Sequence, residues 1–195
     1  RTHSAIDALL KIMEEHPIRY EDLEEIECAT DDKAFEILVH PSPKTPLEAK
    51  FSMPYCLAVA FLEKGVSIHH FDLDWMKNPM VVNTMKKIRH IPDEEIISKG
   101  YEYRGTSKIR VKLKNGKEFY EEVEKSKGHP KNPLSHEEIV GKFCRWAKGM
   151  FDQKRIDSIL FRVDQLEDQE DISDMMNDLA FPNPNDIRVQ SMGGG

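Results

Sequence analysis

The chain has 195 residues, 39% of them hydrophobic and 32% charged, which is enough for one substantial core or for one domain with an appendage. Its net charge of −7 argues against a protein whose main partner is nucleic acid. No apolar run approaches the roughly 20 residues that a membrane-spanning helix needs, so we expect a soluble globular protein without a membrane partner.

The three cysteines, Cys28, Cys56 and Cys144, are widely spaced and odd in number. Their spacing matches no metal-binding motif, so we expect buried thiols in a reducing, cytoplasmic compartment. His69 and His70 resemble metal ligands at first sight. Neighbours in the chain rarely chelate one ion together, however, and no carboxylate or thiol partner for them is evident, so we expect no metal site.

The first part of the chain alternates between helix and strand patterns. Apolar residues recur at helical spacing over residues 3–15, and Pro17 ends that pattern. Residues 21–29 predict a strand, and residues 31–39 predict a short helix that stops before Pro41 and Pro43.

A capping box, Thr45-Pro46-Leu47-Glu48, predicts the next helix start. The Thr45 hydroxyl can accept a hydrogen bond from the Glu48 amide, and the Glu48 carboxylate can accept one from the Thr45 amide. A strongly apolar helix follows over residues 55–62 and ends at Gly65.

Three polar side chains, Lys50, Ser52 and Tyr55, lie at the N-terminal start of this apolar helix in "EAKFSMPYCLAVAFLEKG". Tyr55 follows Ser52 by three residues, so both can face one side of the helix start. The exposed amides and the positive dipole end there favour an anion. Plainer roles remain open: Tyr55 as a buried tyrosine with a satisfied hydroxyl, Lys50 as a surface lysine, and Ser52 as an N-cap.

The middle of the chain predicts a helix over residues 76–87, a short strand over 88–91 and a hairpin. Basic and apolar residues alternate over 108–114, and Asn115-Gly116 marks a turn before the returning strand, 118–124. We expect a bulged three-residue turn with Gly116 at positive φ, Leu113 opposite Phe119, and Ile109 opposite Val123. The expected fold class is therefore α+β, with an antiparallel sheet flanked by helices.

Positive charge is concentrated between Arg104 and Lys131, a stretch that contains nine Lys or Arg residues and only four Glu. A solvated hairpin face explains this pattern, and so does a local field that attracts an acidic ligand or partner. Lys127, His129 and Lys131 lie at the end of this region, where hinge packing is the default role and substrate contact the alternative.

The character of the chain changes after "SKGHPKNP", residues 126–133. Ser135 and Glu138 form a second capping box, and helical patterns cover residues 135–151, 154–166 and 171–179. We expect a domain over residues 1–128, a crossover linker over 129–134, a helical segment over 135–180 and a disordered tail over 181–195. Three such amphipathic helices are poorly suited to fold alone, so we expect them to pack on a domain that this sequence does not contain.

Three stretches, "THSAIDALL", "EAKFSMPYCLAVAFLEKG" and "KGHPKNPLSHEEIVGKF", resemble the C-terminal half of the MmgE/PrpD family. This family includes 2-methylcitrate dehydratase, cis-aconitate decarboxylase and iminodisuccinate epimerase. The resemblance implies an α+β lid domain, followed by helices that return to an all-helical domain built from an N-terminal half. It also implies a homodimer, and neither a metal nor an organic cofactor.

The resemblance further implies a lyase or isomerase that acts on a small polycarboxylate, in the manner of 2-methylcitrate dehydratase, by proton abstraction or elimination. Tyr55 matches the motif tyrosine of the family and is the expected catalytic residue. Lys50, Ser52 and His3 are the expected substrate-binding residues. The chain begins with Arg rather than Met, so we expect a fragment that is inactive alone. The alternative is a non-catalytic interaction or assembly module that needs a helical partner chain.

Overall fold

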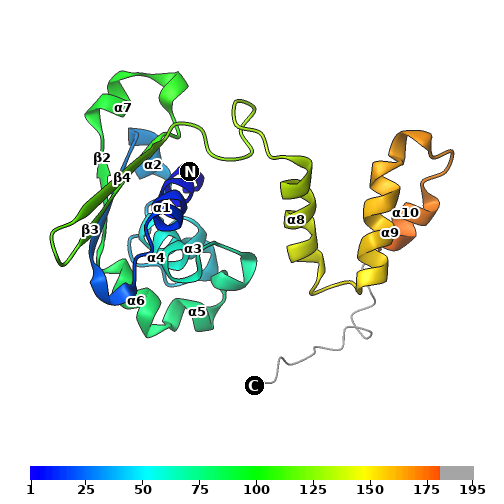
Figure 1. Cartoon of the computed structure of the whole chain (residues 1–195), viewed down its shortest axis with the longest axis horizontal. Coiled ribbons are helices and arrows are strands. Elements are labelled where there is room, and N and C mark those ends of the chain that lie inside the picture. Colours follow the sequence, from blue (N-terminus) through cyan, green and yellow to red (C-terminus); the bar gives the residue numbers. More distant parts are fainter. Residues whose placement is uncertain (181–195) are drawn as a thin grey trace. The chain divides into compact units, whose positions relative to one another are not determined.

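The computed structural model describes residues 1–180, and the chain divides into two compact units, Arg1–Pro133 and a second that begins at Leu134 (Figure 1). The predicted disordered tail, residues 181–195, lies outside the described residues. Within residues 1–180, none of the helices combines the length and the apolar character that crossing a bilayer requires.

The first unit combines short helices with one sheet, which confirms the α+β class. Its strands are β1 (Leu23–Thr30), β2 (Ile88–Pro92), β3 (Ser107–Leu113) and β4 (Glu118–Val123). Its α-helices are α1 (His3–Glu15), α2 (Asp32–Ile37), α3 (Pro46–Lys50), α4 (Met53–Glu63), α5 (Leu73–Lys77), α6 (Pro79–Met85) and α7 (Glu94–Ser98). Three 3-10 turns join them: η1 (Tyr20–Asp22), η2 (Ile68–Phe71) and η3 (Tyr101–Tyr103).

The segment predicted as one helix over residues 76–87 is two helices, α5 and α6, that meet at Asn78. Asn78 ends α5, and its side-chain oxygen accepts a hydrogen bond from the Met80 amide at 2.9 Å to begin α6. Pro79 has no amide hydrogen to continue the first helix, so the chain restarts there.

The four strands are ordered β2-β1-β3-β4. β3 pairs antiparallel with both β1 and β4, as expected, whereas β2 pairs parallel with β1. The sheet is therefore mixed rather than wholly antiparallel. A long connection through α2 to α6 separates β1 from β2, and a crossover of that length allows a parallel neighbour.

The hairpin between β3 and β4 has the predicted three-residue loop, residues 114–116, with Gly116 at φ +84°. The predicted pairs, however, are wrong by two residues. Val111, not Leu113, lies opposite Phe119, because the loop closes directly on Leu113, whose amide donates to the Lys117 carbonyl at 2.9 Å. A two-residue shift leaves every side chain on its predicted face.

The core lies between one face of the sheet and helices α1 and α4 (Figure 1). Ile109 and Val111 of β3 are fully buried on this face, while Arg110 between them is exposed on the other. Leu57 and Val59 of α4 are also fully buried. The alternating pattern of β3 and β4 thus provides the apolar face on which α1 packs, and α4, which carries Tyr55, packs against α1 and β2.

The opposite face of the sheet carries paired charges centred on Glu27 of β1. Its carboxylate accepts hydrogen bonds from Arg110 of β3 at 2.8 Å and from Arg89 of β2, and its side chain is only 14% exposed. One carboxylate therefore links three neighbouring strands.

Replacing Glu27 by Gln is expected to lower the free energy of unfolding by about 1 kcal/mol at low salt, because both arginines lose a charged partner. The loss should shrink as salt is added. Glu24→Gln is the matched control, since Glu24 pairs only with Lys112 among the described ion pairs and is 44% exposed. Urea unfolding, followed by hydrogen exchange of the β1 amides, measures both variants, and an equal loss in the two would contradict the central role of Glu27.

Asp31 connects the end of β1 to two other segments of the first unit. It is 2% exposed and caps α2, accepting a hydrogen bond from the Ala34 amide at 3.2 Å. Its other oxygen accepts one from the Gly105 amide at 2.8 Å and lies 3.6 Å from the Arg1 guanidinium. Ser4 of α1 in turn donates to the Gly105 carbonyl at 2.5 Å. Gly105 is therefore held through both its backbone amide and its backbone carbonyl.

His90 of β2 lies beside this cluster. Its Nε2 lies 2.7 Å from the Thr30 hydroxyl, and its ring stacks on Phe35 with 4.1 Å between centroids. Burial lowers the pKa of His90 to about 4, and the nearby charge of Asp31 opposes this shift.

Because the pKa of His90 is lower in the folded than in the unfolded state, its neutral form stabilises the fold. That contribution is complete above pH 6.5 and is lost as pH falls towards 4. We expect the free energy of unfolding to drop by about 1–2 kcal/mol more in the natural sequence than in His90→Gln over this range. Urea unfolding midpoints of both proteins at pH 7, 5.5 and 4.5 measure this difference. Parallel pH curves for the two proteins would contradict the assignment.

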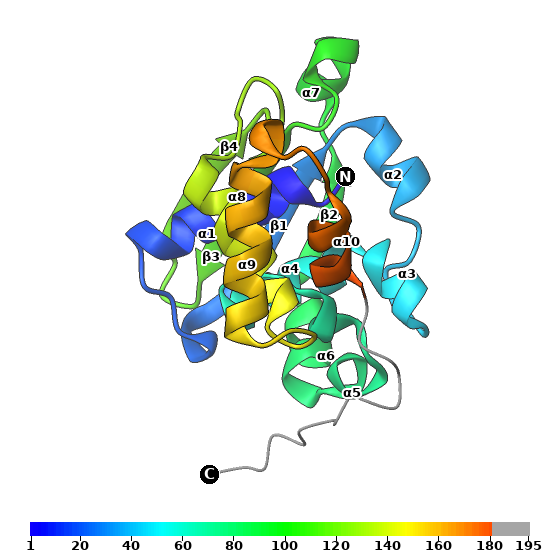
Figure 2. The same ribbon diagram turned by 90° about the vertical axis from the view of Figure 1, so that its right-hand side faces the viewer.

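The second unit, as far as Ala180, is helical, with α8 (His136–Ala147), α9 (Gln153–Asp164), the 3-10 turn η4 (Leu166–Asp168) and α10 (Ser173–Leu179). Ser135 and Glu138 form the predicted capping box at the start of α8. α9 and α10 lie side by side, joined by hydrogen bonds from Arg155 to the Asp178 and Asn177 carbonyls (Figures 1 and 2).

Large apolar side chains are exposed on the second unit, among them Ile139, Trp146 and Phe161. Exposed apolar residues that gather on one surface are typical of interaction sites. This is consistent with the expectation that they pack on a domain outside this sequence.

Candidate functional site

The candidate site is built around the break between α3 and α4. Thr45 caps α3 as predicted, accepting from the Glu48 amide at 3.2 Å, but the Glu48 carboxylate accepts from the Lys44 amide at 2.7 Å rather than from that of Thr45. α3 ends at Lys50, and α4 begins at Met53 with Pro54 in its first turn. The short connection leaves Lys50, Ser52 and Tyr55 close together along the chain at the start of α4.

Ser52 is the N-cap of α4. It is fully buried, and its hydroxyl oxygen accepts a hydrogen bond from the Tyr55 amide at 3.2 Å. This is the capping role that the sequence left open for Ser52. The cap fixes the backbone at Tyr55 and so determines where the tyrosine ring leaves the helix.

Tyr55 is buried, and its hydroxyl donates a hydrogen bond to the carbonyl oxygen of His70 in η2. Its ring lies 5.9 Å from the Phe71 ring, centroid to centroid. Burial, reinforced by the charge of Asp72, raises the pKa of Tyr55 to about 12. The hydroxyl is therefore protonated at neutral pH and is a donor, not a base.

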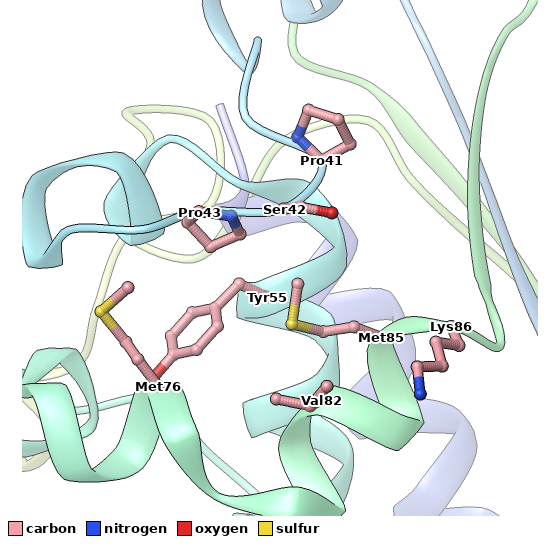
Figure 3. Close-up of a pocket in the computed structure, with 8 residues that line it drawn as sticks. All are labelled: Pro41, Ser42, Pro43, Tyr55, Met76, Val82, Met85 and Lys86. Carbon is pink, nitrogen blue, oxygen red and sulfur yellow. The ribbon is translucent and has the colours of Figure 1, made fainter.

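A pocket of about 220 Å³ lies beside the Tyr55 ring (Figure 3). The ring extends from α4 towards Met76, with Val82 and Met85 of α6 on its other side (Figure 3). The remaining lining residues are Pro41, Ser42, Pro43 and Lys86. The lining is largely apolar, with the Lys86 side chain as its one charged group.

Lys50 is exposed, at the end of α3, and its ammonium nitrogen lies 5.9 Å from the centroid of the Phe71 ring. Phe71 therefore contacts both Lys50 and Tyr55, so η2 connects two of the predicted site residues. A cation against an aromatic face is a weak contact at an exposed position, and it leaves the ammonium accessible to a carboxylate.

His3 is the first residue of α1, and its side chain is exposed. The preceding residue, Thr2, lies close enough to Cys56 of α4 to lower the pKa of its thiol against the larger effect of burial, and α1 packs against α4. The starts of α1 and α4 therefore meet, which brings the segment around His3 to the segment around Tyr55.

Cys56 has a structural environment. Its sulfur lies 3.6 Å from the Ala49 carbonyl of α3, and burial raises the pKa of its thiol to about 12. Cys28 is also buried, as predicted, whereas Cys144 is only partly buried; all three thiols are free. The protonated Cys56 thiol thus contributes packing at the helix start rather than a nucleophile.

The role of His70 was not predicted. Its Nδ1 accepts a hydrogen bond from the Ser67 amide at 3.0 Å, which caps η2, and its ring lies edge-on to Trp75. The contact with Tyr55 comes from its backbone carbonyl, a group that every residue has, so no residue type in the sequence could have indicated it. Among residues 1–180, no three His, Cys, Asp or Glu side chains are grouped so that they could hold a metal ion.

Comparison with known proteins identifies the class of this chain. The sequence profile of the MmgE/PrpD C-terminal domain matches residues 1–166, a range that includes all four predicted site residues. The chain therefore belongs to the MmgE/PrpD family, as the resemblance of its motifs implied.

The relatives that the chain matches are named cis-aconitate decarboxylase. The chain is 28% identical over 152 residues to cis-aconitate decarboxylase of Homo sapiens, covering 77% of this chain and 31% of that protein. It is 30% identical over 148 residues to cis-aconitate decarboxylase of Mus musculus, covering 75% of this chain and 30% of that protein. A third, from Aspergillus terreus, is 24% identical over 140 residues, 69% of this chain and 28% of that protein. The chain thus spans less than a third of the length of these relatives.

Proposed function

We propose that this chain is the C-terminal part of a lyase or isomerase that acts on a small polycarboxylate by proton abstraction and elimination or decarboxylation. The observation that carries the proposal is the family match over residues 1–166, together with relatives named cis-aconitate decarboxylase. We further propose a cytoplasmic homodimer that uses no metal or organic cofactor, and a helical domain that completes the site.

Tyr55 is proposed as the catalytic residue of this part. Its pKa of about 12 keeps the hydroxyl protonated, so it suits the donation of a proton or a hydrogen bond to substrate and not the abstraction of one. In the structure the hydroxyl donates its hydrogen bond to the His70 carbonyl. Catalysis therefore requires the Tyr55 hydroxyl to leave the His70 carbonyl and to donate instead to an oxygen or a carbanion of the substrate.

Lys50 and His3 are proposed to bind the substrate carboxylates. Both side chains are exposed, and a lysine ammonium attracts a carboxylate without a fixed geometry. Ser52 was predicted to bind substrate as well. Its hydroxyl is buried and caps α4 at Tyr55, so we propose that it acts on the substrate only by positioning Tyr55.

The proposal is tested by turnover. The chain is joined to the polypeptide encoded immediately upstream, and the product is offered 2-methylcitrate, citrate, cis-aconitate and iminodisuccinate in separate reactions. We expect turnover of one of them, with the isolated chain inactive. Turnover of none by a folded joined protein would contradict the proposal.

The second candidate function is a non-catalytic interaction or assembly module. The exposed apolar residues Ile139, Trp146 and Phe161 favour it, because they provide surface for a helical partner. A joined protein that is folded and stable, yet inactive towards all four substrates, would support this function instead.

A further inference from the structure

A second pocket of the first unit, of about 370 Å³, has a lining dominated by positive charge. Four cationic side chains and one histidine line it, against a single carboxylate, that of Glu102. They are Arg1, Arg104, Lys125, Lys131 and His129. The chain as a whole carries a net charge of −7, so this pocket is a local reversal of the protein's charge.

One wall of the pocket is the loop that follows β4, and this loop is held by its own hydrogen bonds. The Gly128 amide donates to the Asn132 carbonyl at 2.8 Å, and the Asn132 amide donates to the His129 carbonyl at 2.7 Å. The Asn132 side chain donates to the Lys125 carbonyl at 2.9 Å. Gly128 has φ +88°, a conformation that favours glycine. The loop is therefore a preformed turn and not a loose linker.

The loop is also fixed to the body of the unit, because the Lys127 amide donates to the Asp7 carboxylate of α1 at 2.7 Å. A preformed and anchored turn loses little backbone freedom when a ligand binds, although each lysine side chain still loses rotamer freedom of its own. Folding thus places the backbones of Lys125, His129 and Lys131 around the pocket before an anion binds.

The ring of His129 has a defined orientation. Its Nδ1 accepts a hydrogen bond from the Lys131 amide at 3.1 Å. In the neutral ring the proton must then be on Nε2, which makes Nε2 a hydrogen-bond donor. His129 thus offers a donor to an anion even without carrying a charge.

The opposite wall is η3 with Arg104, and it is joined to the loop. The Lys125 ammonium donates to the Glu102 carbonyl, and the Arg104 guanidinium lies 5.3 Å from the centroid of the Tyr101 ring. Next to Arg104, the Gly105 amide donates to Asp31 and the Gly105 carbonyl accepts from Ser4. The wall is therefore anchored to the residue that follows β1 and to α1.

Arg1 completes the lining but contributes less free charge, since its guanidinium lies 3.6 Å from the Asp31 carboxylate. If Arg1 and Asp31 are counted as cancelling, Arg104, Lys125 and Lys131 still exceed Glu102 by two charges. Two uncompensated charges match a ligand with at least two negative charges. The volume is within the range of about 300–1,000 Å³ that small-molecule sites occupy.

We propose that this pocket binds a small anion with two or more negative charges, held by Arg104, Lys131 and the Nε2 donor of His129. The ligand chemistry is that of clustered carboxylates or of phosphate. Binding at this pocket does not depend on the proposed function, because it requires no turnover.

Titrations of the 195-residue chain followed by amide NMR test the proposal, with tricarballylate, pyrophosphate and acetate as the probes. We expect saturable shifts confined to residues 101–105 and 125–132 with tricarballylate or pyrophosphate, and none of comparable affinity with acetate. Preference for tricarballylate indicates a carboxylate ligand, and preference for pyrophosphate indicates a phosphate ligand.

Two double variants, each of which removes two positive charges, distinguish binding at this pocket from non-specific attraction of anions to positive charge. Arg104→Gln with Lys131→Gln is expected to weaken binding at least tenfold. Lys114→Gln with Lys117→Gln, on the exposed hairpin, should leave it within twofold. Equal weakening in both would overturn the proposal, as would the absence of saturation with tricarballylate and pyrophosphate. Binding of poly-glutamate but of neither small anion would overturn it in favour of an acidic macromolecular partner.

Discussion

Tyr55→Phe is expected to lower kcat of the joined protein about 100-fold while the protein stays folded, because a positioned proton donor contributes that much or more to such reactions. The substitution removes one oxygen and keeps the ring against Phe71. The same change leaves the His70 carbonyl without its donor, and we expect this to lower the free energy of unfolding by only about 1 kcal/mol. Initial rates and urea unfolding of the same preparation measure the two effects.

Tyr20→Phe is the matched control for this prediction. Tyr20 is partly buried in η1, and its ring contacts the Lys87 ammonium at 4.5 Å, a contact that phenylalanine retains. We expect unchanged turnover in this control. If Tyr55→Phe also turned over substrate at the natural rate, Tyr55 would be a core tyrosine whose hydroxyl only secures η2.

Replacing Asp31 by Ala is expected to lower the free energy of unfolding of the first unit by about 3 kcal/mol, because a buried charged acceptor with several partners is lost. The Ala34 and Gly105 amides lose their acceptor, and the Arg1 guanidinium loses its nearby carboxylate. Asp31→Asn, which keeps one acceptor oxygen, should cost less. Hydrogen exchange of the β1 and β3 amides measures the loss in this unit alone.

The neighbouring residue provides a control for Asp31. Asp32 is exposed, and its carboxylate accepts a hydrogen bond from the Lys33 amide at 2.9 Å. We expect Asp32→Ala to cost less than about 1 kcal/mol, in the range of a helix-terminal charge. Similar losses for the two aspartates would mean that burial of Asp31 contributes nothing beyond a helix cap.

Local chemistry made several elements of this fold predictable. The helix starts at Thr45 and Ser135 follow from side chains that cap their own backbone within three residues. The positive φ of Gly116 follows from the Asn-Gly turn. These features depend on neighbours in the chain, which the sequence displays directly.

Features that depend on distant segments were not predictable in this way. The parallel pairing of β1 with β2 joins strands separated by α2 to α6. The Tyr55 hydroxyl binds a backbone carbonyl fifteen residues away, which no side-chain pattern marks. The basic run was visible as composition, yet only folding places Arg104 and Lys131 around the same pocket.

The central claim is that this chain supplies one part of a polycarboxylate-transforming site, and complementation tests it most directly. The 195-residue chain and the polypeptide encoded upstream are produced separately, then mixed, and the initial rate with cis-aconitate and 2-methylcitrate is measured at increasing ratios of the two. The account predicts that neither part is active alone and that the rate with one substrate rises and saturates as the parts associate. The claim would be contradicted if the two parts associated but turned over none of the four substrates, cis-aconitate, 2-methylcitrate, citrate and iminodisuccinate.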